Sequence, residues 1–429
     1  MLDLIVPTLV GISAGFVSGF IPGIGNFACL LILFPYLFTL DPIQILILYV
    51  ALTTISQYIG SIPAITYGVP GESSSIPAVI ESKNLKDSKQ TYRAIVQSAI
   101  GSTFGGIIVL LCTWLAVDHL MVLMKFFDTK AQLVLYFGML IIMTFVVTSN
   151  TVIMNIFLIC LGIGLGLIGY NRWFAMPIMT FDRPELYGGL PLIVVIIVLL
   201  GLPEILKNFN IKQKYVPLQK EKIKINFNFI TSSWYTLVGF IGGLAPGMTT
   251  TMSSQLAYLY SKIKTKDPVD RITAAETANN AGAFSQLIPL MLLGIPLIGS
   301  EALILNVMYA KGFYLGQSTF PEVFQTVGFS LVIINIVGLI LAWPLARHIS
   351  KLFQIDLKII YSVIFTILLL VVLWVGHSNF QIVFYALTFL ALLPIAIMLR
   401  HYDTMPLIFA FLIHDRLFEL AFRSYYLFN

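Results

Sequence analysis

Long apolar segments follow one another along nearly the whole chain, and they limit the possible folds more than any other feature. Each runs about 17–25 residues, enough for a helix to cross roughly 30 Å of hydrocarbon. Of the 429 residues, 58% are hydrophobic and 10% are charged, whereas soluble domains carry about 25% charged residues. The segments do not alternate as barrel strands would. The sequence therefore predicts an all-α polytopic membrane protein with about 11–13 transmembrane helices.

Several function classes lack their usual signatures in this sequence. The five histidines show no metal-ligand spacing and the three cysteines lie in apolar stretches, so we expect no metal site and no cofactor. A Gly-x4-Gly-Lys-[Ser/Thr] loop for ATP does not occur. We see no nucleophile–base pair and therefore expect no enzyme. The net charge of +5 comes from loop lysines, which predict orientation in lipid rather than nucleic-acid binding.

The longest polar stretch divides the chain into two halves. Residues 206–229 carry six lysines, which predicts a basic cytoplasmic linker. We therefore expect a first transmembrane half at 1–205 and a second at 230–429.

One ordered string of motifs occurs in each half. The first copy reads Gly15-x3-Gly19-x2-Pro22-Gly23, then Asp41-Pro42, then Ile62-Pro63-x4-Gly68-Val69-Pro70. The second reads Gly239-x3-Gly243-x2-Pro246-Gly247, then Asp267-Pro268, then Ile288-Pro289-x4-Gly294-Ile295-Pro296. A whole string repeated at nearly constant spacing indicates an internal duplication.

Loop charges predict that the two repeats are inverted. The first Asp-Pro loop has no Lys or Arg, whereas the second carries Lys262, Lys264, Lys266 and Arg271. After the first repeat comes a basic loop at 83–93, but after the second only Lys311. Because basic loops stay on the cytoplasmic side, equivalent loops should lie on opposite faces. Inverted repeats with broken helices are the layout of many secondary transporters.

Four Pro/Gly clusters should break helices inside apolar sequence: Pro22-Gly23, Gly68–Gly71, Pro246-Gly247 and Gly294–Pro296. In lipid, broken backbone is tolerated only where protein or water covers it. Helix N-termini exposed at such breaks attract anions, so a carboxylate is a natural ligand. The alternative is a plain proline kink, but four breaks in symmetric pairs, flanked by hydroxyl groups, favour a binding site.

Polar residues gather beside these breaks. Asn279 and Asn280 occupy the repeat positions of Thr53 and Thr54, so both halves place a polar pair at the same depth. Such pairs can join helices, and Ser/Thr side chains can satisfy freed backbone groups. We nevertheless predict substrate contact for the following residues: Gly23, Gly25, Asn26, Thr53, Thr54, Gly71, Ser73, Gly247, Thr249, Thr250, Asn279, Asn280, Gly294 and Pro296.

Three glutamates lie next to the breaks, where a charge is costly and a functional role is the default. We predict that Glu72 and Glu276 serve cation coupling, either by carrying H⁺ or by binding Na⁺. An interfacial position is the competing interpretation, and it applies most to Glu301 and to Glu72.

The motifs resemble those of the large membrane subunit of the tripartite tricarboxylate transporters. The first signature is Gly15-x3-Gly19-x2-Pro22-Gly23-x-Gly25, followed by Pro70-Gly71-Glu72. The second is Gly239-x3-Gly243-x2-Pro246-Gly247, followed by Glu276-x2-Asn279-Asn280-Ala281 and Gly294-Ile295-Pro296. The resemblance covers essentially the whole chain.

This resemblance implies a multi-pass permease of the cell inner membrane that takes up tricarboxylate- or dicarboxylate-like acids by cation symport. It also implies two partners, a periplasmic solute-binding protein and a small four-helix membrane subunit. An ion channel, or a transporter of another small solute on the same scaffold, is the alternative. A structural or assembly subunit is a further one.

Overall fold

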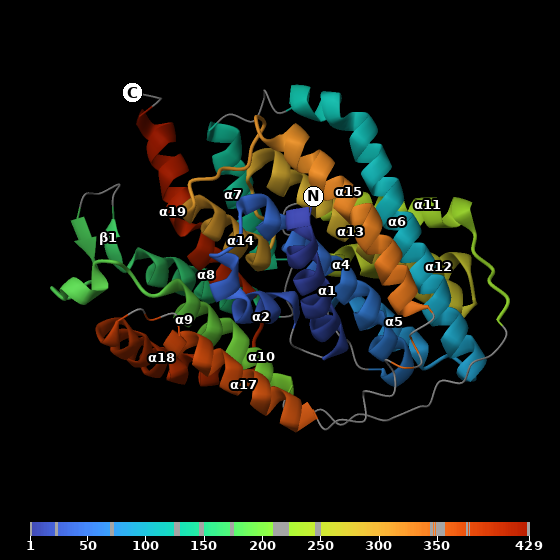
Figure 1. Ribbon diagram of the computed structural model, residues 1–429, viewed down its shortest axis with the longest axis horizontal. Helices are drawn as coiled ribbons and strands as arrows, with labels where there is room; N and C mark the ends of the chain where they lie inside the picture. Colours follow the sequence, from blue (N-terminus) through green and yellow to red (C-terminus); the bar gives the residue numbers. More distant parts are fainter. Residues whose placement is uncertain are drawn as a thin grey trace.

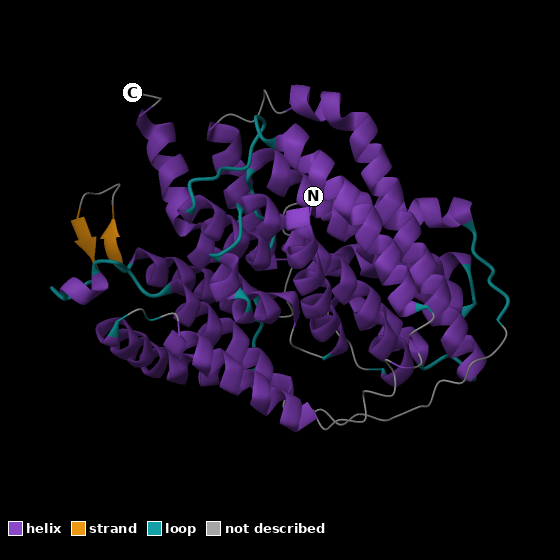
Figure 2. Cartoon of the chain, viewed as in Figure 1, coloured by secondary structure: helices purple, strands orange, loops and turns teal. Residues whose placement is uncertain are grey.

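A computed structural model gives the arrangement of the chain, and nearly all of its regular structure is helical (Figure 2). It describes residues 2–21, 25–68, 73–123, 129–145, 150–171, 176–208, 223–244, 250–343, 346, 348, 357–374, 376 and 378–426.

The elements follow one another from the N-terminus to the C-terminus (Figure 1). The first half contains η1 (Leu2–Leu4), α1 (Ile5–Phe20), α2 (Gly25–Ile32), α3 (Phe34–Leu37), α4 (Pro42–Tyr67), η2 (Ser73–Ser75), α5 (Ile76–Ser82), α6 (Ser88–Leu123), α7 (Thr129–Phe145), α8 (Val152–Leu167), β1 (Gly169–Asn171), β2 (Met176–Ile178), η4 (Pro184–Leu186), α9 (Leu192–Ile196), the π-helical η5 (Ile197–Gly201) and α10 (Leu202–Asn208). The second contains α11 (Phe229–Leu244), α12 (Thr250–Lys264), α13 (Pro268–Leu293), α14 (Gly299–Ala310), α15 (Phe320–Ala342), α17 (Leu357–Trp374), α18 (Asn379–Leu399) and α19 (Met405–Tyr426).

Four described helices are long and apolar enough to cross a membrane, namely α4, α6, α15 and α18. Shorter apolar helices of 10–17 residues accompany them, among them α1, α8 and α11. Large apolar side chains on outer faces are exposed, including Ile153 at 81%, Ile230 at 79% and Leu115 at 73%. In a soluble protein such faces would need a partner, and here hydrocarbon supplies it. The prediction of an all-α polytopic membrane protein is thereby confirmed.

Two equivalent helices, α4 and α13, share one anatomy. Each has 26 residues and begins at a proline directly after an aspartate, Asp41 or Asp267. Proline suits this first position because the helix has no partner for its N–H there. Each helix contains a second proline and ends at a left-handed glycine, Gly68 with φ 65° and Gly294 with φ 63°. That conformation favours glycine.

Each of these helices packs closely against the helix that opens its half. A Cβ atom on Gly15 of α1 would overlap the carbonyl oxygen of Leu52 in α4. A Cβ on Gly239 of α11 would overlap the carbonyl oxygen of Ala278 in α13. Leu52 and Ala278 directly precede the equivalent polar pairs, so equivalent glycines meet equivalent positions.

The next long helix of each half packs on the other half. The helix α6 runs along α13, where Asn280 Nδ2 donates to Ser102 Oγ at 2.7 Å. The helix α15 runs along α4, where Tyr58 donates through its hydroxyl to Asn335 Oδ1 at 2.8 Å. Figure 1 shows α6 and α15 lying across the α4 and α13 region. The halves at 1–205 and 230–429 therefore share their packing, although the boundary between them stays a prediction.

Contacts at the helix ends give the relative direction of α4 and α13. Lys311 Nζ donates to the carbonyl of Phe38, just before α4, at 2.8 Å. Tyr309, two residues before that lysine, donates to the carbonyl of Gly294 at the end of α13. At the other end, Arg271 in the first turn of α13 contacts Glu81, which closely follows α4 along the chain. The two helices consequently run in opposite directions.

The remaining helices lie beside this core. The helix α19 packs on α7 and α8, while α17 and α18 pack with α9, α10 and η5. The strands β1 and β2 form an antiparallel pair that projects from the helices, with Tyr170 opposite Pro177 (Figure 2). This small hairpin lies outside the all-α expectation.

Pro63, part of the first Ile-Pro motif, does not end the helix in which it lies. The helix α4 continues through Pro63 to Tyr67. Proline removes one helical hydrogen bond, yet helices in tightly packed surroundings tolerate that loss. The N–H of Gly68 donates to the carbonyl of Pro63, and the helix ends there rather than at the proline.

Candidate functional site

Two of the helix breaks can be followed in the described residues. The helix α2 begins at Gly25, whose φ is +61° and whose Cβ position, if it had one, would have no described atom within 4 Å. After Gly294 the chain is irregular to Ile298, and α14 then begins at Gly299. Pro296 is buried in that irregular segment. Of the predicted residues, the following lie outside the described part of the chain: Gly23, Gly71, Glu72, Gly247 and Thr249.

Short elements after the breaks contact the opposite half. Ser254 of α12 donates through its hydroxyl to the carbonyl of Ser74 in η2 at 2.7 Å. Ser300 of α14 shares a hydrogen bond of 3.2 Å with the hydroxyl of Tyr49 in α4. Ser74 and Ser300 occupy equivalent repeat positions. Described elements that follow the breaks therefore contact the other half in two places: η2, which holds Ser73, packs against α12, which begins at the half-buried Thr250, and α14 packs against α4.

In the first half, a chain of hydroxyl and amide groups joins three helices. Ser56 of α4 donates to Ser18 of α1 at 3.2 Å, and Ser18 donates to Oδ1 of Asn26 in α2 at 2.9 Å. The hydrogen bond from Ser18 therefore holds the side chain of the predicted Asn26, directly after Gly25. Thr53 uses its hydroxyl on the carbonyls of its own helix, while Thr54 is buried in α4.

In the second half, the polar pair on α13 is fully enclosed. Asn279 is 2% exposed and Asn280 is 0% exposed. The amide nitrogen of Asn280 donates to Ser102 of α6 and to the carbonyl of Glu276. Part of the role of Asn280 is therefore to join helices, as the alternative interpretation held. Among the described residues, no hydrogen bond joins this pair to Thr53 or Thr54.

Several buried side-chain oxygens near the breaks accept no hydrogen bond from the described part of the chain: Gln57 Oε1, Ser253 Oγ, Asn279 Oδ1 and Asn280 Oδ1. A buried acceptor without a donor costs about 1–3 kcal/mol. Such atoms in native proteins face water, an ion or a ligand. Ser253 lies against Gly242 and Gly282, which places its hydroxyl between α11, α12 and α13.

Glu276, predicted to serve cation coupling, is 1% exposed in the middle of this polar face. Its backbone carbonyl accepts hydrogen bonds from Asn280 Nδ2 and, at 3.4 Å, from the hydroxyl of Ser102. No group of three or more His, Cys, Asp or Glu side chains in the described ranges is placed to hold a metal ion.

The sequence did not point to Glu81. This carboxylate is 1% exposed at the end of α5, where Oε1 pairs with Arg271 Nη1 at 3.1 Å. Tyr258 of α12 donates to Oε2 at 2.8 Å, and Asn84 donates to Oε1. Glu81 thus joins the first half to two helices of the second. The signal available in the sequence was an acidic residue directly before the basic loop at 83–93, with Arg271 in the basic loop of the other half.

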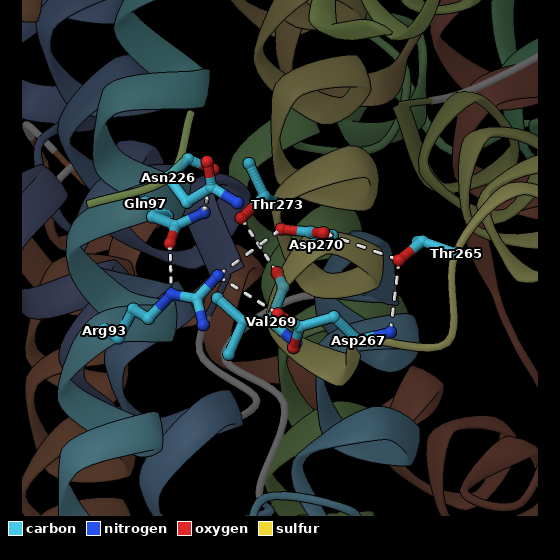
Figure 3. A network of polar contacts seen from close by, with 8 residues as sticks. All are labelled: Arg93, Gln97, Asn226, Thr265, Asp267, Val269, Asp270 and Thr273. Atoms are coloured by element: carbon cyan, nitrogen blue, oxygen red, sulfur yellow. Dashed lines mark hydrogen bonds and ion pairs between the residues drawn. The ribbon is translucent and has the colours of Figure 1, made fainter. Parts of the chain in front are cut away.

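A second ionic group lies beside it at the start of α13. Figure 3 shows Arg93 of α6 pointing at Asp267 and Asp270, with Gln97 next to it. Arg93 Nη2 lies 3.0 Å from Asp267 Oδ2 and 3.8 Å from Asp270 Oδ1. Gln97 continues the network to the carbonyl of Asn226, before α11. The two basic loops at 83–93 and 262–271 therefore meet at the same end of the molecule.

The burial of Glu301 contradicts the interpretation that this residue lies at the membrane interface. Its side chain is 0% exposed in the first turn of α14. An interfacial glutamate keeps its carboxylate in water, whereas Oε2 here accepts from the N–H of Leu297 at 2.6 Å. Burial arises because α2, α4 and α19 all cover α14.

Comparison of the chain with known proteins shows its family. The model of the tripartite tricarboxylate transporter TctA family matches residues 5–409. The chain belongs to the tripartite tricarboxylate transporter TctA family. The chain is therefore a transporter-family protein and the permease subunit of a tripartite system. Proteins of this family work with a periplasmic binding protein and a small membrane subunit.

Two curated relatives come from Agrobacterium vitis. One, an uncharacterized 52.8 kDa protein in the TAR-I ttuC' 3' region, is 26% identical over 98% of this chain and 86% of its own length. The other, an uncharacterized protein in the TAR-II ttuC' 3' region, is 29% identical over 29% of this chain and 56% of its own length. No solved structure matches the chain.

Proposed function

We propose that this TctA-family permease takes up a small tricarboxylate- or dicarboxylate-like acid by cation symport across the cell inner membrane. A periplasmic solute-binding protein delivers the acid, and a small four-helix subunit completes the membrane complex. The observation that carries the proposal is the fully enclosed Oδ1 of Asn279, beside broken helices, with no donor in the described chain.

The site offers different groups to the acid and to the cation. Backbone N–H groups at the starts of α2, α12 and α14 suit carboxylates, because helix N-termini carry free donors and partial positive charge. The buried amide carbonyl oxygens suit a cation because they can only accept or coordinate, and hydroxyl oxygens can also coordinate a cation through their lone pairs. No described atom crowds the Cβ position of Gly25, and Asn26 next to it is fixed by Ser18, which supports a ligand site at the first break.

The two halves form an inverted repeat in this proposal. Support comes from the shared anatomy of α4 and α13 and from their opposite directions. Further support comes from the charges: the two basic loops meet at one end, and the sparsely charged loops near Phe38 and Lys311 meet at the other. The positive-inside rule places the basic end in the cytoplasm.

The test is uptake by proteoliposomes that contain the permease and small subunit, with the binding protein added outside. Labelled citrate and succinate are supplied with an imposed proton or sodium gradient, and omission of the binding protein is the control. Gradient-dependent accumulation of one acid that requires the binding protein is expected. Uptake that ignores the binding protein, or that stops at equilibrium under every gradient, contradicts the proposal.

A further inference from the structure

Glu301 is a buried carboxyl group for which the proposed function has no role. It lies at 0% exposure in α14, which follows the break at Gly294–Pro296. One oxygen, Oε2, accepts from the N–H of Leu297 at 2.6 Å. The other, Oε1, is buried and has no hydrogen-bond partner among the residues that the structure describes. No described salt bridge includes Glu301.

An ionised carboxylate in these surroundings is expensive. Its desolvation costs several kcal/mol even after relaxation, and the backbone N–H groups of Leu297 and Ile298 offset that cost only in part. Burial of this kind therefore favours the protonated form of the group. A titratable group buried among the helices of a membrane protein, with no ionic partner in the described ranges, is the kind of residue that proton-coupled transporters use.

Among the described helices around α14, no charged side chain pairs with Glu301 to hold its carboxylate ionised. The helices α2 and α4 contain no Asp, Glu, Lys, Arg or His, and the titratable side chain that reaches α14 from them is Tyr49, bonded to Ser300. On α19, Arg416 and Arg423 both pair with Glu419. His414 bonds the carbonyl of Phe411, and Asp415 is the other charged residue of that helix. Within α14, Tyr309 bonds Gly294.

The hydrogen bond from Leu297 connects the protonation state of Glu301 to the helix break. Leu297 directly follows Pro296, which belongs to the predicted substrate site. A charged acceptor binds an N–H group about twice as strongly as a neutral one. Loss of the proton therefore tightens the segment between Gly294 and Ile298 against α14, and gain of the proton loosens it.

We propose that Glu301 binds and releases the coupling proton of the transport cycle, an assignment that rests on the proposed uptake function. A proton from external water forms an O–H bond at Oε1, and the same bond breaks when the proton passes to water on the cytoplasmic side. No other bond changes, so the step needs no further reactant.

Glu301→Gln separates this role from a structural one. The glutamine oxygen keeps an acceptor for the N–H of Leu297, but the side chain cannot titrate. Counterflow exchange of labelled citrate or succinate at equal pH should stay within about threefold of the wild type, whereas accumulation driven by a pH gradient should fall more than about tenfold. The matched control is Glu322→Gln, an exposed glutamate in the first turn of α15, which should change neither rate.

A second measurement does not depend on transport. Dicyclohexylcarbodiimide reacts with protonated carboxyl groups in apolar surroundings, so labelling of Glu301, followed by mass spectrometry, should slow as the pH rises. Labelling that is absent, or independent of pH, overturns the assignment even if no acid is transported. Wild-type accumulation driven by sodium alone, or full pH-driven accumulation by the Glu301→Gln variant, also overturns it while the proposed uptake stands. Failure of every labelled acid to accumulate counts against the proposed function, and the labelling then decides on Glu301.

Discussion

Arg271, in the first turn of α13, donates to the enclosed carboxylate of Glu81 at the end of α5, at 3.1 Å. This ion pair joins a short element of the first half to a long helix of the second. The Glu81 side chain is 2% exposed and that of Arg271 is 17% exposed. Removal of one partner leaves a buried charge without compensation, which costs far more than the loss of a surface pair.

Glu81→Ala should lower the free energy of unfolding by about 3–5 kcal/mol, the usual range when one partner of a buried pair is lost. The neighbouring Arg93–Asp267 pair is the matched comparison, because its side chains are 22% and 31% exposed. Asp267→Asn should cost about 1 kcal/mol, as partly exposed pairs do. Thermal unfolding in detergent measures both. The double variant Glu81→Ala/Arg271→Ala should recover part of the loss, and strict additivity would contradict the coupling.

Gly15→Ala and Gly239→Ala should each destabilise the protein by about 1–3 kcal/mol through overpacking. The added Cβ meets the backbone of α4 in one case and of α13 in the other, and backbone cannot rotate away. Gly138 in α7 has no described atom within 4 Å of the corresponding position. Gly138→Ala should therefore be neutral or stabilising by up to about 1 kcal/mol, since alanine favours helix. Equal melting temperatures for all three variants would exclude the close approach.

Asn279→Ala and Asn280→Ala should both abolish uptake while membrane insertion is retained. They should differ in stability. Asn280→Ala also removes the bond to Ser102, which is worth about 0.6–1.7 kcal/mol between membrane helices. Asn279 Oδ1 has no described partner, so Asn279→Ala should leave the unfolding temperature nearly unchanged. Uptake assays and thermal unfolding give both quantities, and full uptake by either variant removes that residue from the site.

Single cysteines at Lys264 and at Tyr314 should react from opposite sides of the membrane. Both residues are exposed, the first at the end of α12 and the second in the loop after α14. The basic end of the molecule should face the cytoplasm. An impermeant maleimide applied to intact spheroplasts should therefore label position 314, and position 264 only after lysis. Labelling of both from one side would rule out the inverted arrangement.

Sequence reasoning was strongest where a local rule fixes the backbone. Asp41-Pro42 and Asp267-Pro268 open their helices, and Gly68 and Gly294 end them, because caps and left-handed glycines act within a few residues. Pro63 shows the limit of such rules. Packing around α4 overrides the proline, and the helix continues to Tyr67.

The polar site was harder to predict than the helix ends, because it depends on packing between segments far apart in the sequence. The sequence identified Asn279 and Asn280 as buried polar residues, but Ser102, the partner of Asn280, lies 178 positions away. The sequence alone does not show that Glu81 and Glu301 are buried. Their burial arises when α12 and α13 cover the first, and α2, α4 and α19 cover the second. No spacing rule within one segment contains that information.

The helix α6 of the first half packs on α13 of the second half, and α15 of the second half packs on α4 of the first. This arrangement affects how the protein folds during its synthesis. The helix α6 leaves the ribosome well before α13, against which Ser102 and Gly101 rest. Until then its glycine- and hydroxyl-bearing face has no protein to cover it. The first half therefore enters the membrane before all its helices have their packing partners. Its packing is completed only when helices of the second half have been inserted.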